Sequence, residues 1–250
     1  MTGGEWPASG LRALVVVPTY NERDNLPTLL EALLQIPDLA VLIVDDGSPD
    51  GTGALADEAA STHPDRVAVL HRTGQPGLGL SYVDGLARAL ATGIPLICQM
   101  DADHSHAPAD VPRLMAAASA ADLVIGSRYI PDGRIENWPL HRRALSAFAN
   151  RYIRAITGLG IRDCTSGFRC WRREILLQIP WERIASDSYA FLVELAWEAV
   201  SRGARVQEVP ITFVERRLGV SKLSWRTLRE SARLPWQLVR RGRRYSTSNR

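Results

Sequence analysis

Short apolar runs and segments with helical periodicity alternate through the first half of this chain, and this alternation limits the fold more than any other feature. The apolar runs cover 14–17, 41–44, 67–70, 95–100 and 123–126, and the helical segments cover 25–36, 52–60, 80–90 and 109–121. Strands that alternate with helices need right-handed crossovers and form a mostly parallel sheet covered on both faces. The sequence therefore predicts a Rossmann-like α/β fold.

Polar residues follow four of the predicted strands. They lie at Pro18–Glu22, Asp45–Asp46, Asp101–Asp103 and Ser127–Arg128. In open α/β sheets the carboxyl ends of parallel strands share one edge, and ligands bind beyond that edge. We therefore expect these four clusters, which are distant in sequence, to converge on one site.

The second half of the chain is less regular. Residues 140–158 carry an apolar stripe at helical spacing, a helix is expected over 187–200, and a strand over 206–213 is interrupted by Pro210. Two interpretations of 140–158 stay open, because a basic amphipathic helix either packs on the sheet or docks on anionic lipid. For the Trp- and Arg-rich tail we favour docking, and we predict a catalytic domain over 1–222 with a helical, membrane-proximal extension over 223–250. The stripe consists of Leu145, Phe148, Ala149, Tyr152 and Ile156.

Charge is distributed unevenly between the two halves. Residues 1–125 contain 16 acidic and 6 basic residues, residues 126–250 contain 11 acidic and 24 basic residues, and the net charge of the chain is +3. Lys222 is the only lysine among these basic residues, and arginine is suited to bidentate contacts with phosphate. This division suggests a cation site in the first half and phosphates or an anionic membrane surface near the second; no nucleic acid is expected as a partner.

Apolar runs and cysteines indicate the compartment. No apolar run approaches the ~20 residues of a membrane-spanning helix, and the N-terminus lacks the pattern of a secretory signal. Cys98, Cys164 and Cys170 show neither metal-binding nor paired spacing, which favours a reducing compartment. We expect a peripheral protein on the cytoplasmic side of the plasma membrane, bound directly or through a separate membrane-embedded partner.

Asp101 and Asp103 form a DxD triplet after a predicted strand. Mg²⁺ and Mn²⁺ prefer hard oxygen ligands and commonly combine one or two carboxylates with substrate phosphates. The competing interpretation is that the triplet caps a loop or the next helix. His104 and His106 are interpreted as loop histidines, because these ions prefer oxygen.

Two further strand ends have the composition of a nucleoside site. In Asp45–Thr52 a carboxylate could accept hydrogen bonds from a ribose or a base, and in Pro18–Glu22 an aromatic ring could stack on the base. The alternative for both is an ordinary turn between strand and helix. The glycine-rich stretch 74–79 lacks a P-loop lysine, and no GxGxxG follows the first strand, which argues against an NAD-dependent oxidoreductase.

The order and spacing of these motifs resemble a known family. Over about residues 11–225 the chain resembles the polyprenyl/dolichyl-phosphate mannose synthases of glycosyltransferase family 2, which have the GT-A fold, and in particular the actinobacterial polyprenol monophosphomannose synthases. The motifs that carry the resemblance are Pro18–Glu22, Val44–Thr52, Asp101–Asp103, Gly126–Arg128, Asn137–Pro139, Ser166–Arg169 and the segment from Arg216 through Gly219 to Lys222.

This resemblance implies transfer of mannose from GDP-mannose to a polyprenyl phosphate, with inversion and with Mg²⁺ or Mn²⁺ as cofactor. Asp101, Asp103 and Arg128 would be catalytic. Ser105 stands where many relatives have a glutamine metal ligand, so the implied metal site is Asp101, Asp103 and Ser105. The implied donor site is Pro18, Tyr20, Glu22, Val44, Asp46, Asp101, Ala102, Asp103, Arg128, Arg216 and Lys222, and the implied acceptor-phosphate site is Arg128, Arg142 and Ser146.

Two alternatives to this function stay open. A related enzyme would move glucose or N-acetylglucosamine from a UDP-sugar to the same kind of lipid, and a non-catalytic module would only bind the nucleotide sugar. The second is disfavoured because Asp101, Asp103, Arg128 and Lys222 are all present. An acceptor phosphate is already anionic near neutral pH, so the lack of a convincing catalytic base is expected, and rate enhancement would come from positioning and charge stabilisation.

Overall fold

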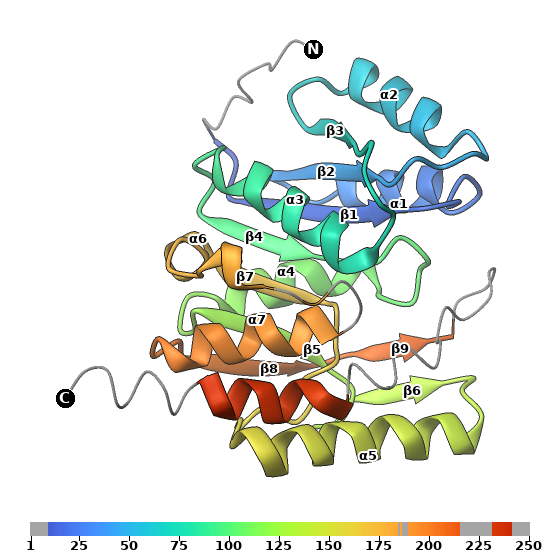
Figure 1. Cartoon of the computed structure of the whole chain (residues 1–250). Coiled ribbons are helices and arrows are strands. Elements are labelled where there is room, and N and C mark those ends of the chain that lie inside the picture. Colours follow the sequence, from blue (N-terminus) through green and yellow to red (C-terminus); the bar gives the residue numbers. More distant parts are fainter. Residues whose placement is uncertain (1–9, 185, 187–189, 216–231, 242–250) are drawn as a thin grey trace.

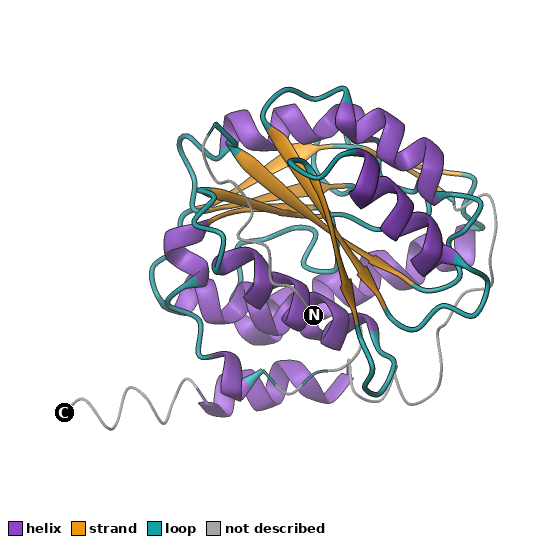
Figure 2. Cartoon of the chain, turned by 90° about the horizontal axis from the view of Figure 1, so that it is seen from above, coloured by secondary structure: helices purple, strands orange, loops and turns teal. Residues whose placement is uncertain are grey.

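A computed structural model describes residues 10–184, 186, 190–215 and 232–241. Its centre is a seven-stranded sheet with helices on both faces (Figures 1 and 2). The strand order is β3-β2-β1-β4-β7-β5-β8. In chain order these strands are β1 Ala13–Thr19, β2 Leu39–Asp45, β3 Val67–His71, β4 Leu96–Gln99, β5 Leu123–Ser127, β7 Arg169–Arg172 and β8 Val206–Pro210.

The sheet is mostly parallel, as the alternation of strands and helices predicts. The pairs β1–β2, β2–β3, β1–β4 and β5–β8 are parallel, and β7 runs antiparallel to both of its neighbours, β4 and β5. A small second sheet pairs β6 (Arg134–Glu136) with β9 (Thr212–Val214). The helices are α1 Leu26–Leu34, α2 Thr52–Thr62, α3 Leu78–Leu90, α4 Val111–Ala117, α5 Leu140–Thr157, α6 Arg173–Leu176 and α7 Ala190–Ser201.

Each face of the sheet has its own hydrophobic core. Along β1, Leu14 and Val16 pack with α3 and α7, whereas Val15 and Val17 pack with α1 and α4. Side chains of successive strand residues point to opposite faces, so a strand covered on both sides is apolar throughout. The continuous apolar runs therefore mark strands that are buried on both faces.

The expected elements differ from the structure in a few places. The helix expected over 109–121 is shorter, because a 3₁₀ turn precedes α4, and α3 begins inside the expected 74–79 loop. The strand expected over 206–213 is divided: β8 ends at Pro210 and pairs with β5, and β9 joins the second sheet. Proline has no N–H to donate to a ladder, which favours a strand end at that position.

Strand β7 is absent from the sequence-based prediction. Arg169, its first residue, is fully buried and donates hydrogen bonds to the carbonyl oxygens of Ser166, Leu192 and Cys164 at 2.6–2.8 Å. Burial lowers the pKa of Arg169 to about 10. A segment that begins and ends with arginine does not match the apolar pattern of a central strand. Arg169 can be buried here because carbonyl groups from other parts of the chain accept its hydrogen bonds.

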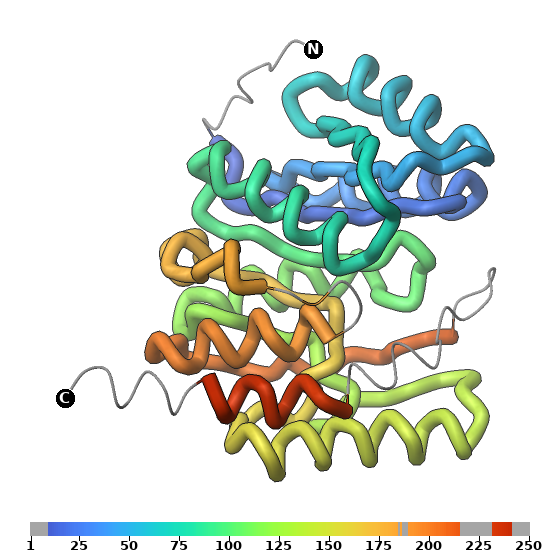
Figure 3. Tube along the Cα trace, in the orientation of Figure 1, coloured from blue at the N-terminus to red at the C-terminus, as the bar shows by residue number. Residues whose placement is uncertain are grey.

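Residues 232–241 are helical and lie beside α5 and α7 (Figure 3). Tyr152 of α5 donates from Oη to the carbonyl of Ala232 at 2.9 Å, and Leu234 and Leu238 are buried in the core. This part of the predicted tail therefore packs against the α/β body, while the boundary at 222/223 stays a prediction. Among the described residues, no helix has both the length and the apolar character to cross a membrane.

Gly85 supplies a test of the packing of α3 on the sheet. A Cβ atom there would lie 2.5 Å from Val16 Cγ1 and 2.8 Å from Val44 Cγ2. We expect Gly85→Ala to lower the free energy of unfolding by about 1–3 kcal/mol because it overpacks this core, as measured by urea denaturation. Gly160→Ala is the control, since nothing lies within 4 Å of a Cβ at that position; equal stability of both variants would contradict the prediction.

Candidate active site

The loops after β1 and β2 form one continuous surface. Pro18 and Val44 are opposite each other in the parallel pairing of these strands. Beyond the strand ends, the amide of Asn21 donates to Ser48 Oγ at 3.1 Å, and the amide of Glu22 donates to Thr52 Oγ1 at 3.0 Å. The two motifs expected to bind a nucleoside are therefore joined by hydrogen bonds.

The residues predicted to bind the nucleoside differ in what they can offer. Tyr20 is 37% exposed. Glu22 accepts a hydrogen bond from Asn25 Nδ2 at 2.7 Å. Pro18 is buried and the side chain of Val44 lies in the core, so Val44 offers only its main chain at this surface.

Asp46 already has partners in this structure. It forms an ion pair with Arg72 and accepts a hydrogen bond from the amide of Gly77 at 2.7 Å. Arg72 also donates to Asp84 at 2.6 Å. Sequence reasoning missed Arg72, which follows β3 and reaches the surface predicted for the nucleoside from the neighbouring strand.

The DxD turn follows β4 and is held from two sides. Tyr82 of α3 donates from Oη to Asp101 Oδ1 at 2.9 Å. Asp103 Oδ1 accepts the amide of Ser105 at 3.1 Å. Gly167 lies directly against Asp101, because a Cβ there would be 3.5 Å from both carboxylate oxygens. The Ser166–Arg169 motif thus places its glycine beside the DxD turn.

The chemistry of this turn fits a divalent cation. Asp101, Asp103 and Ser105 line the same cavity, and Ser105 Oγ is buried with no hydrogen-bond partner in the described part of the chain. These are hard oxygen donors, which Mg²⁺ and Mn²⁺ prefer. Within the described ranges no group of three or more His, Cys, Asp or Glu residues is arranged to hold a metal.

The two histidines near this turn have structural contacts. His106 is buried and stacks on Phe168, with ring centroids 5.0 Å apart, and its Nδ1 accepts the amide of Asp101 at 3.3 Å. Burial lowers the pKa of His106, against the opposing influence of Asp101 and Asp103. His104 Nε2 lies 2.9 Å from Thr28 Oγ1. A neutral His106 thus supports the backbone of the DxD turn.

Arg128 enters the site as half of a buried ion pair. Its Nε and Nη2 donate to the two oxygens of Asp163 at 2.7 Å each, and Nη2 also contacts Thr165 Oγ1 at 2.9 Å. Burial favours the neutral form of Asp163, but the charge and hydrogen bonds of Arg128 hold the pKa of that carboxyl below its usual value. Nη1 has no hydrogen-bond partner among the described residues and remains available to a ligand.

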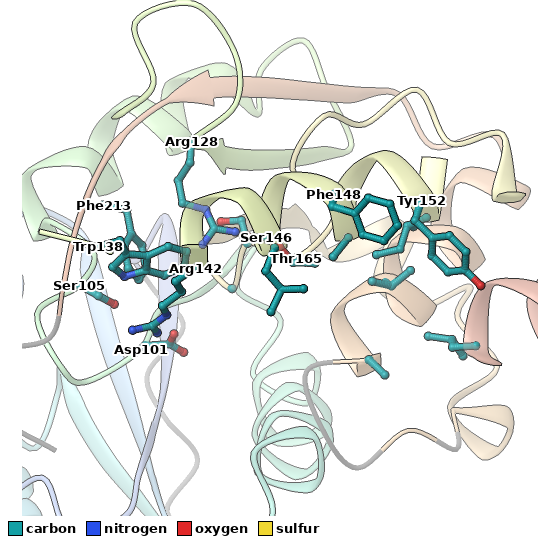
Figure 4. Close-up of a pocket in the computed structure, with 18 of the residues that line it drawn as sticks. Asp101, Ser105, Arg128, Trp138, Arg142, Ser146, Phe148, Tyr152, Thr165 and Phe213 are labelled. Carbon is teal, nitrogen blue, oxygen red and sulfur yellow. Dashed lines mark hydrogen bonds between the residues drawn. The ribbon is translucent and has the colours of Figure 1, made fainter. Parts of the chain in front are cut away.

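Aromatic rings surround the two arginines of this site (Figure 4). The Arg128 guanidinium carbon lies 5.6 Å from the Trp138 ring centroid and 5.2 Å from that of Phe213. Arg142 lies 4.2 Å from the Trp138 ring, and its Nη1 donates to both oxygens of Glu215 at 2.6 and 2.7 Å. The indole Nε1 of Trp138 is buried with no partner in the described ranges, so it is a further free donor.

One cavity of about 480 Å³ brings six of the predicted site residues together. Asp101 and Arg142 lie at the same end of it, with Arg128 and Ser146 close by (Figure 4). The predicted nucleoside residues lie outside its walls, on the neighbouring strand ends. Arg216 and Lys222 fall outside the described residues. The six residues in the cavity wall are Asp101, Asp103, Ser105, Arg128, Arg142 and Ser146.

Sequence reasoning missed several residues that shape this cavity. Asp163 and Thr165 hold Arg128, and Phe213 closes one wall. Trp138 belongs to a motif that carried the family resemblance, but no role follows for it from the sequence. The missing signal is long-range pairing: Asp163 is 35 residues from Arg128, and no local pattern relates the two.

Comparison with known proteins finds similar sequences over most of the chain. The model of the family described as glycosyl transferase family 2 matches residues 14–179. The chain is 50% identical over 233 residues to a polyprenol monophosphomannose synthase from Mycolicibacterium smegmatis, covering 91% of this chain and 88% of that protein. It is 46% identical over 215 residues to an undecaprenyl-phosphate mannosyltransferase from Micrococcus luteus, covering 86% of this chain and 88% of the relative.

A solved structure shows the same fold. A glucosyl-3-phosphoglycerate synthase from Mycobacterium tuberculosis, in complex with Mn²⁺, UDP and phosphoglyceric acid, superimposes with a TM-score of 0.65 at 18% identity, covering 92% of this chain and 77% of that one. The expected α/β fold with a mostly parallel sheet is therefore confirmed, and it is the glycosyltransferase GT-A fold.

The buried ion pair between Arg128 and Asp163 leads to a stability prediction. We expect Asp163→Asn to lower the free energy of unfolding by about 3–5 kcal/mol, because it leaves the Arg128 charge buried without a counter-charge. The control is Asp122→Asn, whose partner Arg205 is exposed, and which should cost about 1 kcal/mol or less. Urea denaturation at neutral pH measures both, and equal losses would contradict the prediction.

The same ion pair predicts a pH dependence. The pKa of Asp163 is lower in the folded state than in the unfolded chain, where it is about 3.9. The ionised carboxylate therefore contributes its full stabilisation above the pKa of the unfolded chain. This stabilisation is lost as the pH falls through the lower pKa of the folded state. The difference in unfolding free energy between the parent chain and Asp163→Asn should therefore shrink on acidification. A constant difference from neutral pH down to about pH 2 would contradict the assignment.

Proposed function

Because this chain belongs to glycosyl transferase family 2, we propose that it transfers mannose from GDP-mannose to a polyprenyl phosphate, with inversion at the anomeric carbon. The observation that carries the proposal is the 50% identity over 233 residues to a polyprenol monophosphomannose synthase. The cavity supports it, since a carboxylate pair and two arginines, Arg128 and Arg142, face the same space.

We assign the donor to the surface at the ends of β1 and β2. Tyr20 stacks on the base, Glu22 and Asp46 accept hydrogen bonds from the nucleoside, and Pro18 and the main chain of Val44 form the floor. In this assignment the carboxylate of Asp46 accepts hydrogen bonds from the nucleoside while it also pairs with Arg72. The assignment extends to Arg216 and Lys222, which bind donor phosphates.

We assign a divalent cation, Mg²⁺ or Mn²⁺, to Asp101, Asp103 and Ser105. When bound, it neutralises charge on the diphosphate leaving group. Ala102 is buried and fixes the turn between the two carboxylates. Tyr82 and the amide of Ser105 each bond one carboxylate oxygen, so both side chains are oriented before any ligand binds. Such preorganisation reduces the reorganisation that the reaction requires.

The acceptor phosphate binds between Arg128 and Arg142 in this proposal. Within the described ranges Arg128 Nη1 and Trp138 Nε1 have no hydrogen-bond partner, and Ser146 offers a hydroxyl on the first half of α5. The phosphate oxygen is anionic and attacks the anomeric carbon without a general base. The buried pair with Asp163 keeps Arg128 charged and fixed, so its contribution is orientation and charge stabilisation.

We further propose peripheral binding to the cytoplasmic face of the plasma membrane, directly or through a membrane-embedded partner. Four large apolar side chains of α5 and the segment 232–241 are strongly exposed: Leu140 by 80%, Leu145 by 50%, Phe148 by 66% and Trp236 by 55%. Arg143, Arg151 and Arg154 are exposed on α5 as well. Exposed apolar and basic side chains on one helix are typical of surfaces that bind anionic lipid.

The test is an incubation with labelled nucleotide sugar, Mg²⁺ or Mn²⁺ and polyprenyl phosphate in detergent. Label in the organic phase from GDP-mannose alone is the expected result. Label in the organic phase from UDP-glucose alone would contradict the mannose assignment and favour the second candidate, a transferase that uses a UDP-sugar as donor. Nucleotide-sugar binding with no lipid product from either donor would favour a binding module.

Asp103 provides a sharper test of the mechanism. We expect Asp103→Ala to lower kcat by about 10²–10³-fold, because the cation that neutralises the diphosphate loses a ligand; thermal unfolding shows that the variant is folded. Asp57→Ala, on an exposed face of α2, is the matched control and should keep full activity. Unchanged kcat in Asp103→Ala would remove the DxD turn from the mechanism.

Glu215 competes with the acceptor phosphate for Arg142. Its carboxylate accepts two hydrogen bonds from Nη1 of that arginine, so phosphate binding has to displace or share this contact. We expect Glu215→Gln to lower the KM for polyprenyl phosphate about fivefold, the equivalent of about 1 kcal/mol for a partly exposed ion pair, with the KM for donor unchanged. A raised acceptor KM would show that Glu215 positions Arg142 instead.

A further inference from the structure

Helix α5 carries two of the groups that we assign to the acceptor phosphate, but few of its side chains are buried. Arg142, Ser146 and Asn150 follow one another at intervals of four residues, so they share one face of the helix. The buried side chains of α5 are Asn150 and Ile153. A polar amide is therefore one of the two buried side chains that hold this helix against the α/β body.

Asn150 is an unfavourable residue for packing alone. Its side chain is 3% exposed, and its Nδ2 donates to the carbonyl of Ser146 and to Thr165 Oγ1 at 3.1 Å each. Its Oδ1 is buried with no hydrogen-bond partner in the described part of the chain. An apolar side chain would avoid the free-energy cost of this unpaired atom. Since buried polar groups restrict the elements around them to one arrangement, the effect of Asn150 lies in the geometry that it imposes on α5.

Thr165 joins this helix to Arg128 (Figure 4). Its hydroxyl donates to Asp163 Oδ1 at 3.3 Å, and it accepts from Arg128 Nη2 at 2.9 Å and from Asn150 Nδ2 at 3.1 Å. A hydroxyl has one hydrogen to donate and two lone pairs to accept with, so these three hydrogen bonds use its full capacity. The orientation of the hydroxyl is therefore fixed, and one oxygen atom links α5 to the Arg128 guanidinium.

The cavity wall indicates how Asn150 acts on a ligand. The wall contains Thr165, Arg128, Arg142 and Ser146 but not Asn150. An influence of the Asn150 amide on a ligand therefore passes through its hydrogen-bond partners.

We propose that Asn150 is a positioning residue that sets, through Thr165, the distance between Arg128 and the phosphate-binding groups of α5. This inference rests on the proposed function and concerns how the acceptor phosphate is recognised. Donors from two elements bind one phosphate well only when their separation matches its oxygen atoms, and a small displacement weakens both contacts. The bond between Asn150 and Thr165 holds β5 and α5 at one such separation. The surface proposed for the nucleoside, at the ends of β1 and β2, does not depend on this bond.

Two substitutions remove the bond from opposite sides. Thr165→Val removes the hydroxyl and Asn150→Leu removes the amide, each with little change in volume. We expect each variant to raise the KM for polyprenyl phosphate about tenfold and to leave the KM for GDP-mannose within about twofold. Thr165→Ser, which keeps a hydroxyl, should retain the acceptor KM of the parent chain. Thr157→Val is the matched control, because the Thr157 hydroxyl donates to the carbonyl of Ile153 at 2.7 Å, within the last turn of α5.

The double variant tests the route of the effect. If Asn150 acts through Thr165, the amide has no influence on the acceptor once the hydroxyl is gone. Asn150→Leu should then raise the acceptor KM of Thr165→Val by less than about twofold, whereas two independent effects would give about a tenfold further rise. That further rise overturns the proposal, as does an acceptor KM in Asn150→Leu equal to that of Thr157→Val. Thermal unfolding shows that the variants are folded, and if Thr165→Val is not, the comparison of Asn150→Leu with Thr157→Val decides.

Equilibrium binding of labelled polyprenyl phosphate in detergent, without GDP-mannose, separates this proposal from the proposed function. Weaker acceptor binding in Asn150→Leu, with no mannosyl product from the parent chain, would support the positioning role and contradict the function. Mannosyl product from the parent chain, with the same acceptor binding and acceptor KM in Asn150→Leu, would support the function and overturn the positioning role.

Discussion

The buried pair between Arg128 and Asp163 is the interaction on which the site depends. A guanidinium and a carboxylate removed from water are tolerated only when each satisfies the other, and here two parallel hydrogen bonds of 2.7 Å do so. The pair joins the end of β5 to the loop before β7, and Thr165 extends it toward α5 through Asn150. It thereby sets the position of Arg128 Nη1, which has no hydrogen-bond partner in the described part of the chain, at the wall of the cavity.

The two ends of the proposed reaction site are built differently. The surface that we propose for the nucleoside and the DxD turn consist of residues that follow their own strands directly, and hydrogen bonds between neighbouring loops hold them. The end that we propose for the acceptor is assembled from β5, α5, β9, α7 and residues 232–241. The division of charge along the chain follows the same line, because the acidic first half supplies the carboxylates and the basic second half supplies Arg128 and Arg142.

This difference explains how much could be predicted from the sequence. Local periodicity predicts strands β1 to β5, and the polar residues at a strand end indicate the DxD turn. Neither signal requires knowledge of tertiary contacts. Strand β7 could not be found in this way, since the burial of Arg169 relies on carbonyls up to 23 residues away. Asp163 and Glu215 were missed for the same reason: each acquires its role from an arginine 35 or 73 residues distant.

The apolar stripe of α5 illustrates the limit most clearly. Its spacing predicts an amphipathic helix, and the helix is there, but Asn150 and Ile153 are the residues of α5 that become buried. Leu145, Phe148 and Ala149 instead line a cavity whose opposite walls come from α7 and residues 232–241. Periodicity identifies an apolar face but not what that face contacts, because a core, a membrane and a lipid chain all offer hydrocarbon. The polar groups at one end of the cavity bear on this choice, because hydrocarbon alone offers no partner to the guanidinium groups of Arg128 and Arg142 or to the hydroxyl of Ser146 that line it.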